Sequence, residues 1–299
     1  MADSRKRTVA LVTSTSLPTL YEDDRLLVPA LAELGIGAVP AVWSDSTIDW
    51  RAFDAVVLRS PWDYYERPEE FRAWLDVRHA EQVLLCNSAE IVKWNFDKSY
   101  LQSLARAGVA LIPTIVIAKN EHVDIAALAH ARGWSEIVVK PTLAAGAYRT
   151  YRFRVEELDR FADDIAATLA DRGVLVQPFL PEIQSDGELS LLFFDGVFSH
   201  AVCKRPKPGD YRVQFQYDGT NESVQVNQTL IAQARVCLDH APALPVYARV
   251  DGLVKDGAFL LMELEVFEPL MFLSRHPAAP ARFARAIAKR LRDDDGSTS

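Results

Sequence analysis

The sequence predicts an α/β fold in which an N-terminal parallel sheet is followed by smaller α+β subdomains. Two observations carry this prediction. Strand-like apolar segments alternate with helical segments through residues 1–94, which is typical of parallel strands joined by helices. The last third of the chain is instead rich in strands separated by short turns, which is typical of a mostly antiparallel sheet.

The first segment, 1–94, is expected to bind a substrate. Its strands are TVALVTS, AVPAVW, FDAVVLRS and QVLLCNS, and its helices are YEDDRLLVPALAELG and RPEEFRAWLDVRHA. Ligands of such sheets bind beyond the carboxyl ends of the strands, so candidate contacts follow the third strand. These are Arg59, Ser60, Trp62 and Tyr64. We expect the Arg59 guanidinium to pair with a substrate carboxylate. The alternative is a proline-terminated turn whose tryptophan packs in the core.

The second segment, 95–178, combines strands, helices and a loop rich in small residues. It opens with the helix NFDKSYLQSLARAGV, for which Asn95 or Asp97 is the expected N-cap and Gly108 the expected end. The strands IPTIVI, EIVVKP, YRTYRF and VLVQPFL follow, with the helix VEELDRFADDIAATLADRG before the last of them. The loop PTLAAGAYRT after Lys140 is of the kind that closes over phosphates.

The third segment, 179–299, carries two acidic residues on an otherwise apolar strand, FLLMELEVFEP. Alternation predicts four of its side chains in the core, namely Leu260, Met262, Leu264 and Val266. Glu263 and Glu265 then share the other face, about 7 Å apart, where like charges repel. A magnesium ion neutralises such a pair. The alternative is a half-exposed strand with surface glutamates.

The geometry of one hairpin tests the metal hypothesis. Asp251 in ARVDGLVKDGAFLLMELE must lie on the face of Glu263 and Glu265 if all three bind one metal. A two-residue turn in KDGA would instead place Asp251 opposite Met262, on the core face. A shared site therefore requires a three-residue turn or a β-bulge, with Gly257 at a positive φ.

Composition and missing motifs exclude several classes of protein. The net charge of −8 argues against a general nucleic-acid binder, because phosphates require an excess of cations. The three cysteines form no CxxC motif and are expected to be reduced and buried, which indicates a cytoplasmic protein. No segment approaches the 18 apolar residues of a membrane span. The motifs GxxxxGK[ST], GxGxxG and GxSxG are absent.

Lysines and carboxylates instead recur in a particular order. Lys98 opens a helix, and Lys140 enters the small-residue loop. The extended backbone of VLVQPFL can face an adenine, with the Phe179 ring against the base, and Glu188 in GELS is a possible ribose acceptor.

A basic segment and a later arginine complete this order. The sequence KRPKPGDYR, with Lys204 and Arg212, is the one dense basic patch of an acidic chain, although a solvated loop would look the same. Arg249 and Asp251 then share one face of the strand before the acidic strand.

This order resembles the ATP-grasp family over most of the chain. The resemblance is carried by DKSYLQSLARAGVALIPT, VVKP, VQPFL followed by GELS, and ARVDGLVKDGAFLLMELE. It implies an ATP-grasp fold with a substrate-side domain at 1–94, a central subdomain with the lid at 95–178, and a C-terminal subdomain with the metal site at 179–299.

The resemblance also implies roles for individual residues. The ATP phosphates would be held by Lys98 and Lys140. The adenine and ribose would be held by Gln177, Phe179, Leu180 and Glu188. Arg249 would face the transferring phosphoryl group, with Lys204 and Arg212 as further catalytic candidates. Magnesium, expected as two ions, would be held by Asp251, Glu263 and Glu265. Two departures from the family are a glutamate at position 265, where asparagine is usual, and a single glycine, Gly146, in the loop.

Within the family, the chain is similar to ligases of antibiotic biosynthesis that close a five-membered ring on a ureido derivative of serine. The similarity lies in the length, the segment LRSPWDYY and the acidic strand. It implies ATP-dependent activation of a carboxylate, ring closure, and release of ADP, phosphate, carbon dioxide and ammonia. The expected partner is a small amino-acid-derived molecule, with no nucleic acid or membrane, and the protein is expected to be a monomer or homodimer. The alternatives are another ATP-grasp amino-acid or peptide ligase, or a nucleotide-binding module without activity.

Overall fold

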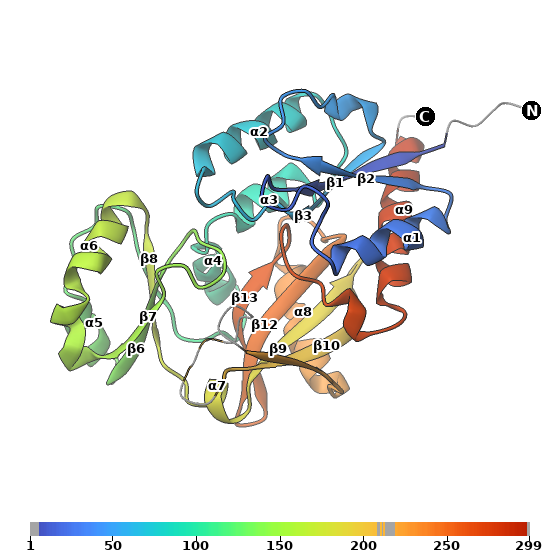
Figure 1. Cartoon of the computed structure of the whole chain (residues 1–299). Coiled ribbons are helices and arrows are strands. Elements are labelled where there is room, and N and C mark those ends of the chain that lie inside the picture. Colours follow the sequence, from blue (N-terminus) through green and yellow to red (C-terminus); the bar gives the residue numbers. More distant parts are fainter. Residues whose placement is uncertain (1–5, 208–209, 211, 213–218, 298–299) are drawn as a thin grey trace, which may run out of the picture.

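The N-terminal sheet is parallel, as predicted (Figure 1). We describe the protein from a computed structural model, which describes residues 6–207, 210, 212 and 219–297. The strand order is β2-β1-β3-β4. The strands are β1 (Thr8–Thr13), β2 (Gly37–Val42), β3 (Ala55–Ser60) and β4 (Leu85–Cys86). The helices of this part are α1 (Leu27–Ala32), α2 (Pro68–Ala80) and α3 (Ala89–Asn95).

Strand β3 is apolar without alternation because its two faces enter two different cores. Val56 and Leu58 belong to the core that includes Phe71 of α2, whereas Ala55 and Val57 belong to the core that includes Leu31 of α1. The apolar run at 55–58 therefore suits β3 to its place inside the sheet, between β1 and β4.

The middle sheet is antiparallel and has the order β5-β8-β6-β7. Its strands are β5 (Ile115–Ile117), β6 (Glu136–Pro141), β7 (Tyr151–Arg154) and β8 (Val174–Pro178). The helices of this part are α4 (Tyr100–Arg106), α5 (Ile125–His130) and α6 (Ala162–Asp171). Figure 1 shows α5 and α6 on the outer side of this sheet, which leaves its other side toward the rest of the molecule.

The start of α4 clarifies the two expected caps. Ser99 is the N-cap of α4, without a side-chain cap hydrogen bond, so neither predicted cap holds that position. The Asp97 carboxylate accepts a hydrogen bond of 2.9 Å from the Ser99 N–H and so stabilises the turn before the helix. Asn95 instead donates to the Leu264 carbonyl at 2.7 Å and so ties α3 to the C-terminal sheet. Gly108 follows the helix with a φ of 87°.

The C-terminal sheet pairs antiparallel throughout in the order β11-β10-β9-β12-β13. Its strands are β9 (Glu188–Phe194), β10 (Val197–Arg205), β11 (Thr220–Val224), β12 (Tyr247–Lys255) and β13 (Ala258–Glu265). The helices are α7 (Glu182–Ser185), α8 (Gln228–Asp239) and α9 (Ala279–Ser297). Each of the three sheets lies within one of the three predicted segments, and boundaries near residues 94 and 178 remain our proposal.

The β12–β13 hairpin contains the β-bulge that the metal hypothesis requires. The turn has two residues, Asp256 and Gly257, with φ of 51° and 78°. Lys255 pairs with Ala258, yet the register shifts so that Asp251 lies opposite Glu263. Facing residues share a side of the sheet, so these two carboxylates point the same way.

The bulge also corrects the predicted alternation for the part of β13 that precedes it. Phe259 and Leu261 are buried in the core together with Leu264, whereas Leu260 and Met262 are only partly buried. The extra residue of the bulge, Met262, reverses the order of faces, because two residues on one strand then oppose one on the other.

Helix α9 returns from the C-terminal sheet to the N-terminal one (Figure 1). Phe283 and Ile287 of this helix are completely buried in one core with Val9 of β1 and Leu27 of α1. The first and last parts of the chain therefore share a core. No helix among the described residues is long and apolar enough to cross a membrane.

Candidate active site

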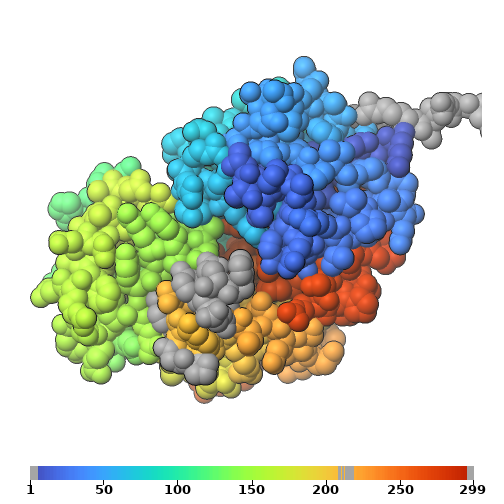
Figure 2. All heavy atoms as spheres, viewed as in Figure 1, coloured from blue at the N-terminus to red at the C-terminus, as the bar shows by residue number. Residues whose placement is uncertain are grey.

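A cavity of about 570 Å³ is lined by residues from all three parts of the chain. Figure 2 shows these parts packed against one another. The cavity wall includes thirteen of the sixteen predicted site residues. They are Trp62, Lys98, Lys140, Gln177, Phe179, Leu180, Glu188, Lys204, Arg212, Arg249, Asp251, Glu263 and Glu265. The fold therefore brings together residues that are up to two hundred positions apart in the sequence.

The two predicted phosphate lysines approach the cavity from different elements. Lys98, just before α4, lies 3.2 Å from a Glu263 carboxylate oxygen and donates to the Ala144 carbonyl at 2.8 Å. Burial lowers the pKa of Lys98, but Glu263 and Glu268 offset this effect, so its pKa is raised. Its ammonium is therefore firmly charged.

The side-chain ammonium of Lys140, near the end of β6, has no hydrogen bond or ion pair within the described structure, although the backbone of Lys140 pairs with β8. Burial lowers the pKa of Lys140, and the nearby Lys98 lowers it further, against the attraction of Glu263. A half-buried ammonium that lines a cavity in this way is well placed to receive an anion.

The middle and C-terminal sheets supply an apolar end to the cavity. Gln177 is buried and donates to the Thr114 hydroxyl at 2.8 Å, which fixes the end of β8. The Arg152 guanidinium lies 3.5 Å from the centre of the Phe179 ring. Leu180 follows on the cavity wall. This end is suited to a flat aromatic group, because apolar side chains and an extended backbone line it.

Glu188 and Lys204 form a buried ion pair on neighbouring strands, β9 and β10. Lys204 also lies 3.4 Å from Asp251. Burial raises the pKa of Glu188, although the Lys204 ammonium acts against this. Arg212, also at the cavity, forms a 2.9 Å ion pair with Asp210. The predicted basic patch therefore contributes charges to the cavity wall.

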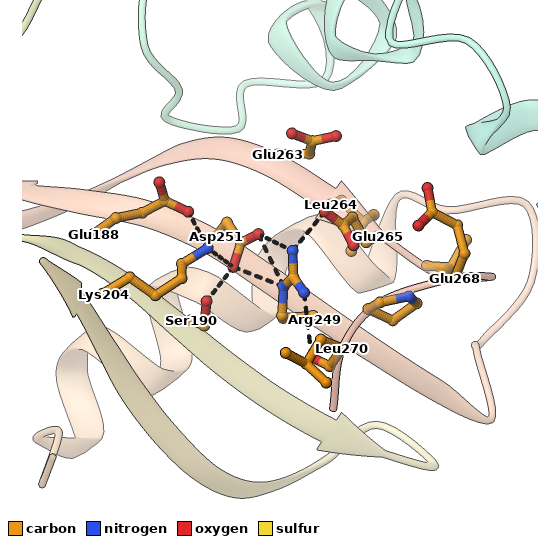
Figure 3. Close-up of polar contacts among 12 residues, drawn as sticks. Glu188, Ser190, Lys204, Arg249, Asp251, Glu263, Leu264, Glu265, Glu268 and Leu270 are labelled. Carbon is orange, nitrogen blue, oxygen red and sulfur yellow. Dashed lines mark hydrogen bonds and ion pairs between the residues drawn. The ribbon is translucent and has the colours of Figure 1, made fainter. Parts of the chain in front are cut away.

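Arg249 is the centre of the ionic network on β12 and β13 (Figure 3). Its guanidinium contacts Asp251 at 2.9 Å and Glu265 at 2.5 Å, and it donates to the Leu270 carbonyl at 3.2 Å. Burial alone lowers the pKa of Arg249, but the two carboxylates raise it well above its usual range. The guanidinium is therefore permanently charged and rigidly held.

The three predicted metal ligands differ in their acidity. Burial acts to raise all three pKa values. The pKa of Asp251 is nevertheless lowered by Arg249 and Lys204, and that of Glu263 is lowered by Lys98 and Lys140. The pKa of Glu265 is raised well above its usual value, because Glu268 and Glu263 add their repulsion to burial.

The donor set fits magnesium in its chemistry, since Mg²⁺ prefers carboxylate oxygens. The carboxylates line one cavity and point to one side of the β12–β13 hairpin. In the arrangement that the structure describes, however, no three acidic, His or Cys side chains converge as a metal cluster within residues 6–207 and 219–297. Arg249 pairs with Asp251 and Glu265, and Lys98 pairs with Glu263. A bound cation would have to compete with these partners.

Three residues predicted to contact the substrate do not line the cavity. Arg59 has no exposed surface, and its guanidinium donates to Asp24 at 2.8 and 3.0 Å and to the Pro269 carbonyl at 2.8 Å. The Ser60 hydroxyl is buried against that of Thr13 at 3.1 Å. The carboxyl end of β3 abuts the segment after β13 rather than open space, which corrects the prediction for Arg59 and Ser60.

Tyr64 is also buried, with an exposed fraction of 2%. Its hydroxyl donates to Glu268 at 2.8 Å, and Glu268 does line the cavity. Of the four predicted contacts, Trp62 is the one on the cavity wall. The prediction missed Glu268 because EVFEP continues past the end of the strand, where alternation assigns no face.

The three sheets and a cavity lined by lysines, arginines and carboxylates define a class of protein. The ATP-grasp domain of prokaryotic glutathione synthetase matches residues 101–250, and the N-terminal domain of D-cycloserine synthetase DcsG matches residues 9–87. The chain belongs to the ATP-grasp ligases.

One relative is similar along the whole chain. The cycloserine biosynthesis protein DcsG of Streptomyces lavendulae is 35% identical over 95% of this chain and 99% of its own. The crystal structure of D-cycloserine synthetase DcsG superimposes with a TM-score of 0.86 at 33% identity, covering 95% of this chain and 99% of that one.

Proteins with much lower sequence identity share the fold. D-alanine–D-alanine ligase from Bacillus anthracis, solved in complex with ATP, has a TM-score of 0.70 at 15% identity. That superposition covers 98% of this chain and 100% of the other. At this level of identity the likeness concerns the fold alone.

Proposed function

We propose that the protein is an ATP- and magnesium-dependent cyclo-ligase that converts O-ureido-D-serine to D-cycloserine. The observation that carries the proposal is the similarity to DcsG along 95% of the chain, which includes the N-terminal part as well as the ATP-grasp part. The N-terminal part supplies Trp62 and Tyr65 to the cavity wall. Trp62 donates to the Glu268 carbonyl at 2.9 Å, which ties it to the end of the carboxylate row opposite Glu188 (Figure 3).

The proposed reaction begins with transfer of a phosphoryl group from ATP to the substrate carboxylate. This forms an acylphosphate and ADP. The ureido nitrogen then forms the ring C–N bond at the acyl carbon, and phosphate leaves. Hydrolysis of the carbamoyl group by one water gives carbon dioxide and ammonia. No cysteine or serine lines the cavity among the residues that the structure describes, and this pathway requires neither.

The residues of the cavity fit this chemistry by their charges. Lys98 and Lys140 hold the ATP phosphates, and Arg249 stabilises charge on the transferring phosphoryl group. Gln177, Phe179 and Leu180 receive the adenine, and Glu188 the ribose. Magnesium neutralises phosphate charge when it is bound. Asp251, Glu263 and Glu265 are the residues that would hold it, after release of their cationic partners.

The direct test is ADP release by the purified protein with ATP, magnesium and a panel of acids. The panel contains O-ureidoserine and O-aminoserine of both configurations, together with ordinary amino acids. We expect ADP release to depend on O-ureido-D-serine, with equimolar phosphate and ammonia and a cyclic product seen by mass spectrometry. ADP release with another amino acid alone would contradict the proposed substrate and leave the ligase class intact.

A second candidate is a ligase that joins an amino acid to a separate amine. The match of residues 101–250 to the glutathione synthetase ATP-grasp domain favours this candidate. The product decides between the two, because intermolecular ligation requires a second amine and yields a linear amide. A nucleotide-binding module without activity would release no ADP with any acid in the panel.

A further inference from the structure

Glu268 stands apart from the residues to which we assign nucleotide or metal contacts. It follows β13 and lies at the opposite end of the row of carboxylates from Glu188 (Figure 3). One of its carboxylate oxygens accepts the Tyr64 hydroxyl at 2.8 Å. The other has no hydrogen bond or ion pair with the residues that the structure describes. Glu268 nevertheless lines the cavity, so this carboxylate is oriented but incompletely satisfied.

The cations near Glu268 are already engaged elsewhere. Arg249 pairs with Asp251 and Glu265, and Lys98 pairs with Glu263. This end of the cavity therefore carries more carboxylates than cations. An incoming positive charge would be stabilised there, whereas a phosphate would be repelled.

An aromatic side chain is anchored to the backbone of Glu268 and shares the cavity wall with its carboxylate. The indole N–H of Trp62 donates to the backbone carbonyl of Glu268 at 2.9 Å, and Trp62 is on the cavity wall. A carboxylate beside an aromatic ring is a favourable environment for an ammonium group, because both attract a cation. Both side chains are held by hydrogen bonds, so the site is organised before a ligand arrives.

We propose that Glu268 binds the protonated α-amino group of the substrate and thereby selects α-amino acids. This inference rests on the proposed function, because it assumes that a small acid enters the end of the cavity away from the adenine site. The amino group is one carbon from the carboxylate that receives the phosphoryl group. Holding it fixes that carboxylate relative to Arg249, which makes Glu268 a specificity-determining residue.

The test compares two substrates and two variants. The substrates are O-ureido-D-serine and its analogue without the α-amino group, 3-(ureidooxy)propanoate. The variants are Glu268→Gln, which keeps the shape and removes the charge, and Tyr64→Phe, which removes the hydrogen bond to Glu268. The control is Glu81→Gln, which changes a glutamate of the N-terminal part whose partner is Arg78 at 2.9 Å, outside the cavity wall.

We expect Glu268→Gln to raise the KM for O-ureido-D-serine about 10- to 100-fold, the usual effect of losing a charge-assisted hydrogen bond. The KM for the deaminated acid, the KM for ATP and the magnesium requirement should stay within about twofold of the parent. The quantity compared is the ratio of the KM for O-ureido-D-serine to the KM for the deaminated acid, which Glu268→Gln should raise. Tyr64→Phe should raise this ratio by a smaller factor, and Glu81→Gln should leave it unchanged. Inhibition constants replace KM where the analogue turns over too slowly.

Two results would overturn the inference. One is an equal rise in KM for both acids in Glu268→Gln, which would make Glu268 a structural residue. The other is a raised magnesium requirement together with an unchanged preference for O-ureido-D-serine over the deaminated acid, which would make Glu268 a metal ligand. If Glu268→Gln does not fold, as judged by thermal unfolding, the ratio measured for Tyr64→Phe decides.

If the proposed cyclo-ligase function is wrong, the substrate preference of the parent protein shows it, separately from the behaviour of the Glu268 variant. A parent protein that uses another α-amino acid contradicts the cyclo-ligase, and the comparison is then made with that amino acid and its deaminated form. A parent protein that uses only acids without an α-amino group contradicts the role of Glu268 itself.

Discussion

The Glu265 carboxylate lines the cavity and forms an ion pair with Arg249 at 2.5 Å. A cation that binds to Glu265 must therefore compete with the guanidinium. Its pKa is raised by burial and by Glu268, which means that the carboxylate is poorly compensated without a further positive charge. A metal ion would supply that charge.

Replacing Glu265 by glutamine is therefore expected to weaken magnesium binding. The change keeps the shape of the side chain and removes one negative ligand, so the magnesium concentration for half-maximal ADP release should rise roughly tenfold. The KM for the amino-acid substrate should change little. A magnesium titration that overlays that of the parent would show that Glu265 is not a ligand.

At the scale of elements, the bulge in the β12–β13 hairpin decides which carboxylates meet. Strand parity in the sequence predicts that a bulge or a longer turn is needed, but it does not locate the extra residue. Gly252 explains the location. A Cβ atom built at this position would lie 2.4 Å from both the Leu260 carbonyl and the Phe259 ring, so the close approach of the strands requires glycine.

Gly252→Ala should consequently disturb both stability and the site. We expect a loss of about 1–3 kcal/mol in the free energy of unfolding, as for other overpacked positions, measured by denaturant titration. The magnesium requirement should rise as well, because Asp251 and Glu263 flank the register shift.

Gly257→Asn is the matched control. The turn residue has a φ of 78°, which asparagine tolerates, and a Cβ atom there meets nothing within 4 Å. Equal destabilisation by the two substitutions would argue that the contact at Gly252 is unimportant.

The structure confirms most of the elements predicted from sequence, because their signals are local. Continuous apolar runs predict β1 and β3, and the alternation beyond the bulge correctly places Leu264 in the core and Glu263 outside it. Arg59 could not be placed from sequence, since its surroundings depend on Asp24 and on Pro269, more than two hundred residues away. The same holds for Glu268, whose partner Tyr64 lies 204 residues earlier in the chain.

At the scale of the whole molecule, Arg59 connects the N-terminal sheet to the segment that carries Glu268. Its ion pair with Asp24 is completely buried, and it also binds the Pro269 carbonyl. Removing one partner of such a pair leaves an uncompensated charge in the interior, which is usually costly.

Arg59→Ala is expected to lower the free energy of unfolding by about 3–5 kcal/mol. In the protein that remains folded, the KM values for ATP and substrate should be close to those of the parent, because Arg59 does not line the cavity. The comparison is Arg51→Ala, which breaks a surface ion pair with Asp49 and should change stability by less than about 0.5 kcal/mol. A stable Arg59→Ala protein with a much higher substrate KM would reinstate a direct contact with substrate.

The return of α9 to the N-terminal sheet has a consequence for the protein during synthesis on the ribosome. Phe283 and Ile287 complete the core around Val9 and Leu27, but they are made more than two hundred and fifty residues after Val9. Helix α1 covers the Val9 face of the nascent N-terminal sheet only in part, so some of its apolar surface stays exposed until almost the whole chain has been translated. Chaperones that shield exposed apolar surface have their greatest opportunity to act on this protein in that interval.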